Sequence, residues 1–298
     1  MERGPVASRR LHLASHVGQV LAATLRTRIG PEHFGLDRRL HHPELGLVEG
    51  VDVELLARNR LDGGRLRQPD SGAVLCANSF LNWQRCPEKL VLTGVGGFRE
   101  LHFATRCPTG IRGTSPLLEL IARHDRGLVA VTGRCVEYLR HHSRSLAAGY
   151  TRVAPPPGLE PWLDLVRLVL QDPGRFRHVD LPTLIKQALG LGRTFPQRSL
   201  VLLYLYLEPA DAAALPPFDA HRCELDEIRR HVDGSRVALR AQTFQELWSE
   251  WEGLGEPHWL RGIITRLRMR YDVAIGNVHG LWSPYGPPGD GAEVMETP

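Results

Sequence analysis

The sequence predicts an α/β fold with a mixed central sheet flanked by helices, and three observations support this fold class. Residues 117–121 and 128–132 are aliphatic runs separated by the turn sequence HDRG at 124–127, a pattern typical of a β-hairpin. Residues 199–207 (SLVLLYLYL) form a nearly unbroken apolar run, as expected of a strand that is buried on both faces. Amphipathic helical patterns lie between and after these strands, which indicates one sheet covered by helices.

The expected elements follow from hydrophobic periodicity and from the residues that end each segment. Apolar residues at helical spacing between Leu11 and Leu25 indicate a first helix, which Gly30 and Pro31 end. A polar stretch rich in glycine and arginine continues to about residue 70. After it we expect helices at 73–83, 136–148, 163–170, 183–191, 220–232, 245–252 and 258–271, and strands at 98–106, 117–121, 128–132, 199–207 and 236–241.

The domain organisation follows from where the sheet would be completed. Three prolines at 155–157 form a rigid connector, but the strand at 199–207 would complete the sheet begun before it. We therefore expect residues 1–275 to form a single α/β domain with an N-terminal helical extension. Residues 276–298 are rich in glycine and proline and lack periodicity, so this tail is predicted to be disordered.

Composition excludes several classes of protein. The five cysteines are an odd number without a CxxC motif, which argues against a disulfide framework and against a thiolate zinc site. No apolar run approaches the ~20 residues that span a bilayer. We therefore expect a soluble, cytoplasmic protein without a membrane partner. The net charge of +4, carried almost entirely by arginine, allows a nucleic-acid partner without requiring one.

The hairpin carries the residues that most clearly suggest a chemical function. A turn centred on residues 125 and 126 pairs residues whose numbers sum to 251, which places Glu119 opposite Thr132 with Cβ atoms about 5 Å apart. Thr132 and Arg134 share a face because they are two residues apart. A carboxylate, a hydroxyl and a cation on one face suit a Mg²⁺-dependent phosphodiester-cleaving site. One polar pair at the rim of a sheet is also common in ordinary proteins, so spacing alone leaves a structural role open.

Several short motifs follow one another in a fixed order along the chain. The principal ones are residues 106–119 (RCPTGIRGTSPLLE), 129–139 (VAVTGRCVEYL), 184–191 (LIKQALGL), 202–206 (LLYLY) and 244–248 (FQELW). Together they resemble a prokaryotic restriction-endonuclease-like family of the PD-(D/E)xK nuclease superfamily. The resemblance covers roughly residues 70–272, and the order of the motifs over that span is more specific than any one motif.

The resemblance implies a restriction-endonuclease-like core, Mg²⁺ dependence and double-stranded DNA as the substrate, as in type II restriction-like endodeoxyribonucleases. By position, Glu119 matches the first metal-binding acid, which is usually Asp. Thr132 stands where the second acid belongs, and Arg134 stands where the catalytic Lys belongs. Glu137 matches an acid at the start of the following helix, whereas Ala104 falls where the family tends to have an acidic residue.

These departures leave three hypotheses. In the first, the protein is a DNA endonuclease in which Glu119 and Glu137 bind Mg²⁺, Arg134 stabilises the pentavalent phosphate and Thr132 orients water. In the second, it is a catalytically degenerate homologue, a pseudoenzyme that binds DNA or a partner protein without cleaving. In the third, it is an unrelated α/β interaction protein. Thr132 and Ala104 favour the second hypothesis, because they stand where two carboxylates of the expected site would be.

Overall fold

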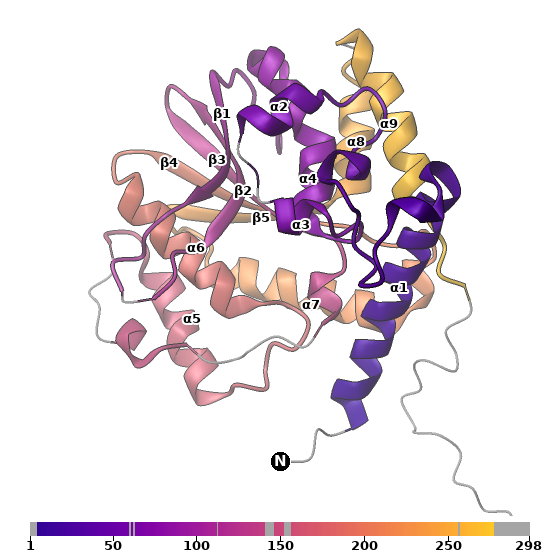
Figure 1. Cartoon of the computed structure of the whole chain (residues 1–298). Coiled ribbons are helices and arrows are strands. Elements are labelled where there is room, and N and C mark those ends of the chain that lie inside the picture. The colour runs from indigo at the N-terminus through magenta and orange to yellow at the C-terminus, as the bar shows by residue number, and fades with distance from the viewer. Residues whose placement is uncertain are drawn as a thin grey trace, which may run out of the picture.

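A computed structural model describes residues 5–59, 61, 63–111, 113–140, 146–151, 156–255 and 257–276. Within these residues a five-stranded sheet forms the centre, with the spatial order β1-β2-β3-β4-β5 (Figure 1). Strand β2 runs antiparallel to both β1 and β3, whereas β3, β4 and β5 run parallel to one another. This arrangement confirms the expected mixed sheet. The strands are β1 (Glu100–Arg106), β2 (Leu117–His124), β3 (Gly127–Arg134), β4 (Ser199–Tyr206) and β5 (Val237–Thr243).

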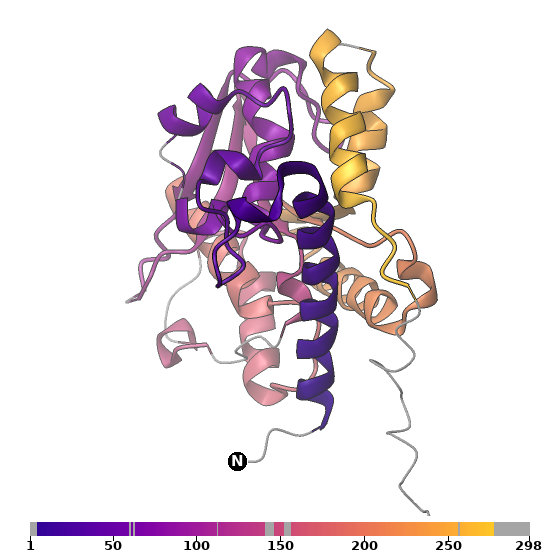
Figure 2. The same cartoon turned by 45° about the vertical axis from the view of Figure 1, so that its right-hand side comes forward.

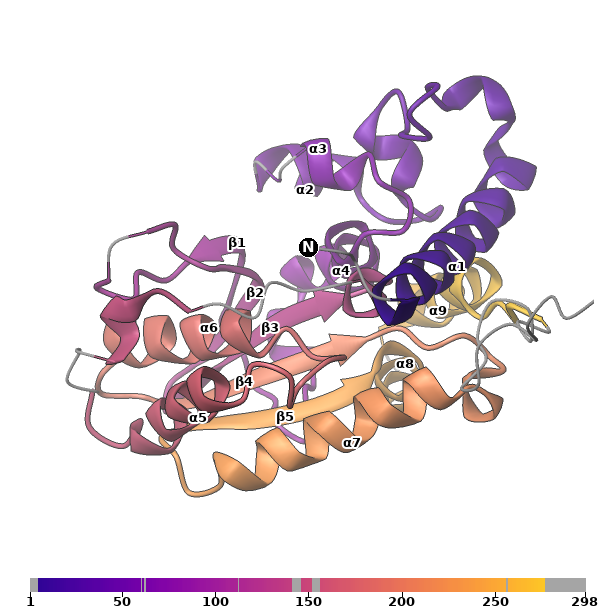
Figure 3. The same ribbon diagram turned by 90° about the horizontal axis from the view of Figure 1, so that it is seen from below.

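Helices cover both faces of the sheet, which confirms the α/β fold class. One layer contains α4 and α8, and the other contains α5, α6 and α7 (Figure 3). Helix α9 packs against α8 and α4, and α1 packs against α9 (Figures 1 and 3). The helices are α1 (Pro5–Ile29), α4 (Gly72–Phe80), α5 (Glu160–Gln171), α6 (Leu181–Thr194), α7 (Pro216–His231), α8 (Phe244–Glu252) and α9 (His258–Tyr271).

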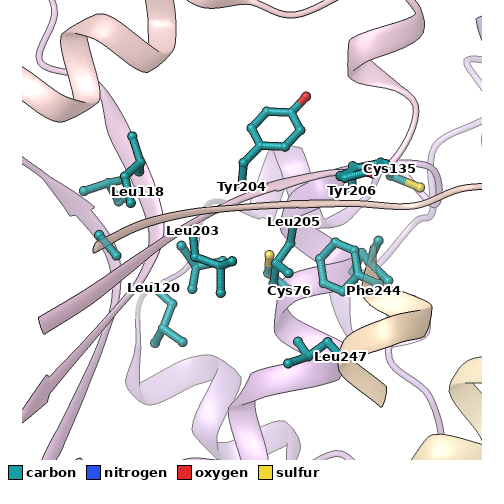
Figure 4. Packing of buried hydrophobic residues seen from close by; sticks show 14 of the residues in the cluster. Cys76, Leu118, Leu120, Cys135, Leu203, Tyr204, Leu205, Tyr206, Phe244 and Leu247 are labelled. Atoms are coloured by element: carbon teal, nitrogen blue, oxygen red, sulfur yellow. The ribbon is translucent and has the colours of Figure 1, made fainter. Parts of the chain in front are cut away.

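The apolar run of β4 explains why the sheet is buried on both sides. Leu203 and Leu205 point toward α4 and α8, where Cys76 and Phe244 lie, whereas Tyr204 points to the opposite side (Figure 4). Strand alternation therefore sends consecutive apolar side chains into both helical layers. All eight residues of β3 are likewise buried. The last residues of β3 therefore lie inside the molecule, whereas both ends of β2 are half-exposed.

The segment after β3 differs from the sequence prediction. We expected a helix at 136–148, but the described part is a single 3₁₀ turn, Glu137–Leu139. Two contacts stop the helix there. The Glu137 carboxylate turns back to accept hydrogen bonds from backbone N–H groups, and the Tyr138 hydroxyl donates to the carbonyl of Leu207. Residues 141–145 lie outside the described residues.

The N-terminal extension contains more structure than its composition suggested. The polar stretch before α4 includes α2 (Val53–Arg58) and α3 (Gly63–Leu66). Asp52 caps α2 by accepting a hydrogen bond from the backbone N–H of Glu54. The tail predicted at 276–298 lies outside the described residues from 277 onward. None of the helices that the structure describes is both long and apolar enough to cross a membrane.

Candidate functional site

The candidate site lies where β2 and β3 separate. The two strands pair from His124 and Gly127 to Leu120 and Val131, with residue numbers that sum to 251 as expected. The regular pairing then stops, and Glu119 has no Cα partner on either neighbouring strand. Across from it, Ala104 of β1 is also skipped and has a φ of 49°, which is uncommon for a residue other than glycine. The skipped pair marks a local distortion at this end of the hairpin.

The Glu119 side chain turns toward the layer of α4. It is 4% exposed, and its Oε1 accepts a hydrogen bond of 2.8 Å from Nη2 of Arg65 in α3. Its Oε2 accepts from the backbone N–H of Gly133 at 3.2 Å, in the gap between β2 and β3. A cavity of about 30 Å³ beside the carboxylate is lined by apolar residues, among them Cys76 and Ala77 of α4. Glu119 is therefore a buried carboxylate with both oxygens engaged.

Thr132 contacts the opposite layer. Its side chain is fully buried, and its hydroxyl accepts a hydrogen bond of 3.1 Å from Nε2 of Gln187 in α6. The same amide donates to the carbonyl of Leu117 at 2.8 Å. The structure thus differs from the expected arrangement, because the carboxylate of Glu119 and the hydroxyl of Thr132 do not meet on one face. The reason is the distortion at Glu119, which breaks the alternation on which the expectation depended.

Arg134 follows Thr132 on β3 and is 9% exposed. Its Nη1 donates to the carbonyl of Gly133 at 3.1 Å. Burial alone would lower the pKa of this guanidinium, but the negative charges around it, first that of Glu119 and then those of Glu137 and Asp180, raise it overall. Arg134 is therefore a fixed positive charge within the electrostatic range of both predicted metal-binding acids.

Glu137 binds backbone rather than another side chain. Its Oε1 accepts from the N–H of Gly72 at 2.7 Å, and its Oε2 accepts from the N–H of Cys135 at 2.6 Å. Gly72 is the first residue of α4, where free N–H groups and the helix dipole favour a negative charge. The geometry gives Glu137 a clear role in joining the end of β3 to the start of α4.

Arg65 is the residue of this site that sequence reasoning missed. It lies in the four-residue helix α3, within a stretch whose many arginines offered no signal to single it out. Burial would lower its pKa, but the charges of Glu119 and Glu137 and its hydrogen bond to Glu119 raise the pKa overall. Arg65 and Glu119 form an ion pair, and Arg134 and Glu137 lie within its electrostatic range; we call these four residues the charge network.

The charge network does not fit Mg²⁺ as it stands. Mg²⁺ prefers octahedral coordination by carboxylate oxygens and water. In the described residues no three His, Cys, Asp or Glu side chains gather in a way that would hold a metal ion. Arg65 already neutralises Glu119, and each oxygen of Glu137 accepts from a backbone N–H. A partly buried group with balanced charges stabilises the end of the hairpin, and its carboxylate oxygens are already engaged by Arg65 and by backbone N–H groups.

Comparisons of the chain with protein-family models, with curated proteins and with solved structures found no match. The resemblance to the PD-(D/E)xK superfamily therefore remains a prediction from the sequence.

Proposed function

We propose that this protein is a restriction-endonuclease-like protein of the PD-(D/E)xK type that binds double-stranded DNA without cleaving it. One observation carries the non-cleaving part of the proposal. The first predicted metal-binding acid, Glu119, is held by the guanidinium of Arg65 at 2.8 Å and by the N–H of Gly133 at 3.2 Å. A cation supplied by the protein itself thus neutralises the carboxylate that a nuclease would use for its metal.

The position of the second predicted acid supports the same proposal. Thr132 carries no charge, and its hydroxyl is bonded to Gln187 in a layer from which bulk water is excluded. Glu137, the residue expected to replace the missing acid, holds two backbone N–H groups instead. The roles proposed from the sequence for Glu119 and Glu137 in metal binding, and for Thr132 in orienting water, would all require these contacts to break.

The DNA-binding part rests on the sequence resemblance and on the charge of the chain. Arginine supplies nearly all of the 37 basic residues, against 33 acidic ones. A guanidinium binds phosphate oxygens with two parallel hydrogen bonds, which makes arginine well suited to a nucleic-acid backbone. Binding of this kind weakens steeply with salt because counterions are released from DNA.

Mg²⁺-dependent cleavage is the second candidate function, and one observation favours it. Glu119 and Glu137 each act electrostatically on both Arg65 and Arg134, so the two carboxylates belong to one network rather than to separate sites. If Arg65 moved away, Glu119 and Glu137 would be the residues to hold the metal. The metal would then polarise the phosphate and acidify a bound water molecule.

A cleavage assay beside a binding assay separates the two functions. Supercoiled plasmid is incubated with the purified protein and Mg²⁺ or Mn²⁺, and a labelled duplex is titrated with the protein at several salt concentrations. We expect intact plasmid together with salt-dependent duplex binding. Nicking or linearisation that Glu119→Ala abolishes would establish the nuclease and overturn our proposal. Intact plasmid without duplex binding at low salt would overturn the DNA-binding part.

A gain-of-function variant tests whether the scaffold is that of a nuclease. Thr132→Glu and Arg134→Lys restore the family pattern at two positions, Gln187→Ala makes room beside residue 132, and Arg65→Met frees Glu119. The matched control carries the last two changes alone. Metal-dependent cutting by the full variant but not by the control would show that the fold retains the geometry of a nuclease. Because residue 132 faces α6 whereas Glu119 faces α4, we expect the folded variant neither to cut DNA nor to bind Mn²⁺, and cutting would overturn the non-cleaving geometry.

A further inference from the structure

A groove of about 770 Å³ runs along α1, outside the charge network. Its floor is a stripe of small residues, Ala14, Gly18 and Ala22, which follow one another at intervals of four and therefore share one helix face. Figure 2 shows α1 crossing the front of the molecule, with the segment that precedes α4 beside its upper part. The opposite wall is formed by residues 37–39, residues 68–70 and Arg140. The absence of a side chain at Gly18 leaves room for the Asp70 carboxylate, which packs against it.

The walls of this groove carry more positive than negative charge. Four arginines line it against two aspartates. Arg39 lies 3.7 Å from Asp37, and Arg140 lies 3.3 Å from Asp70, so both aspartates are paired. Within the part of the chain that the structure describes, Arg26 and Arg38 form no ion pair with a carboxylate. Two guanidinium groups thus remain to attract an anion.

Arg26 contains a donor that lacks an acceptor. Its Nε is shielded from solvent and has no hydrogen-bond partner among the described residues. Its Cζ lies 4.7 Å from the centre of the Phe34 ring, which fixes the plane of the guanidinium by a cation–π contact. A shielded N–H without an acceptor is costly and rare in folded proteins, and a bound ion is one of its ordinary explanations. An oxyanion in the groove would supply the acceptor.

Arg38 stands across the groove at the tip of a tight turn. Its backbone adopts a φ of 63°, the left-handed region that residues other than glycine seldom occupy. The turn is closed by the bonds from the N–H of Arg38 to Gly35 and from the N–H of Gly35 to Arg39. Strained backbone of this kind costs free energy and is concentrated at ligand sites. The turn thus holds an exposed guanidinium beside the groove.

We propose that this groove is a phosphate-binding site in which Arg26 and Arg38 bind the phosphate oxygens. The volume lies within the range of about 300–1,000 Å³ typical of small-ligand sites, so it accommodates a nucleotide. The same chemistry also suits one backbone phosphate of a nucleic acid. Asp70 and Arg140 connect the groove to the charge network, because Asp70 lies two residues before Gly72 and Arg140 lies three residues after Glu137.

The experiment measures phosphate binding to the full-length protein with three probes. Inorganic pyrophosphate and adenosine monophosphate are titrated by calorimetry, and a labelled DNA duplex is titrated by fluorescence anisotropy. The test variants are Arg26→Gln with Arg38→Gln, and separately Ala23→Glu, which adds a carboxylate at an exposed position of the groove. Arg229→Gln on α7 is the matched control, because it removes one exposed arginine from the opposite side of the sheet. Thermal unfolding of each variant shows that it is folded.

We expect Arg26→Gln with Arg38→Gln to weaken the binding of at least one probe by about ten- to hundredfold, since each lost charge-assisted hydrogen bond is worth about that factor. Ala23→Glu should weaken the binding of the same probe, because its carboxylate repels the phosphate. Arg229→Gln should leave affinity unchanged. Loss of pyrophosphate and nucleotide binding would identify a free nucleotide as the ligand, and loss confined to the duplex would identify a nucleic-acid backbone. If no probe distinguishes the groove variants from the control, the inference is wrong. If the groove variants bind the duplex and the two small probes as the control does, the inference is overturned while the proposed function stands. A wild-type protein that binds pyrophosphate but no duplex would overturn the proposed function alone.

Discussion

Removal of the Glu119 carboxylate should destabilise the protein strongly, because the account makes it a structural residue. Glu119→Ala removes a charge-assisted hydrogen bond to Arg65, worth about 1.5 kcal/mol once the partial exposure of Arg65 is allowed for. It also leaves the N–H of Gly133 without its acceptor, at a cost of about 1–3 kcal/mol. The expected loss in the free energy of unfolding is therefore about 2.5–4.5 kcal/mol.

Urea unfolding followed by circular dichroism measures this loss. The midpoint should fall by about 1 M, since m-values of small proteins are about 1–3 kcal/mol per molar urea and increase with size. A double-mutant cycle with Arg65→Ala should give a coupling energy of at least about 1 kcal/mol between the two side chains. The matched control is the exposed pair of Glu54 and Arg58, for which the same cycle should give at most about 0.5 kcal/mol.

The opposite result would refute the structural role of Glu119. An acid kept for metal binding is repelled by its neighbours when the metal is absent, so its removal commonly stabilises the protein at the expense of activity. An unfolding midpoint that rises or stays constant in Glu119→Ala, together with a coupling energy near zero, would show that the contact with Arg65 contributes nothing.

Three further predictions concern other parts of the described chain. Glu137→Ala should lower the free energy of unfolding by about 2–4 kcal/mol, because the N–H groups of Gly72 and Cys135 lose their acceptor. Glu137→Gln should recover part of that lost free energy. Equal stability of the two variants in urea would contradict this prediction. Of the five thiols, only Cys223 is exposed, and burial raises the pKa of the other four, Cys76, Cys86, Cys107 and Cys135. Cys223 should therefore react fastest with a thiol reagent at neutral pH, and Cys223→Ser should abolish the fast phase. The hydrogen bond from Arg85 lowers the pKa of the Asp52 carboxyl in the folded state. The ionised carboxylate therefore stabilises the folded protein at pH values above the unfolded pKa, and this stabilisation is lost as the pH falls through the lowered pKa. Asp52→Asn should thus reduce the urea midpoint at neutral pH and leave it unchanged in strong acid.

The sequence predicted the sheet well because its signals are local. The apolar run at 199–207 and the hairpin around residues 125 and 126 contain their own periodicity and turn chemistry, and the structure confirms both, including the register. The helix expected at 136–148 was wrong within its described part. There the carboxylate of Glu137 accepts from the backbone N–H of Gly72, 65 residues away in sequence, a contact that periodicity does not reveal.

The candidate site was harder to predict for a related reason. The alternation rule placed Glu119 and Thr132 on one face, but a distortion at Glu119 and Ala104 turns the carboxylate toward α4. Arg65, its partner, lies 54 residues earlier in a stretch without regular periodicity. A sequence pattern gives the identity of the residues near a strand end, whereas the direction of each side chain depends on long-range partners.

The most direct test of the central claim is a calorimetric titration of Mn²⁺ into the wild-type protein. Because Arg65 neutralises Glu119 and no second acid among the described residues faces it, we expect no saturable binding at millimolar metal. Stoichiometric Mn²⁺ binding by the wild-type protein that disappears in Glu119→Ala would contradict the account.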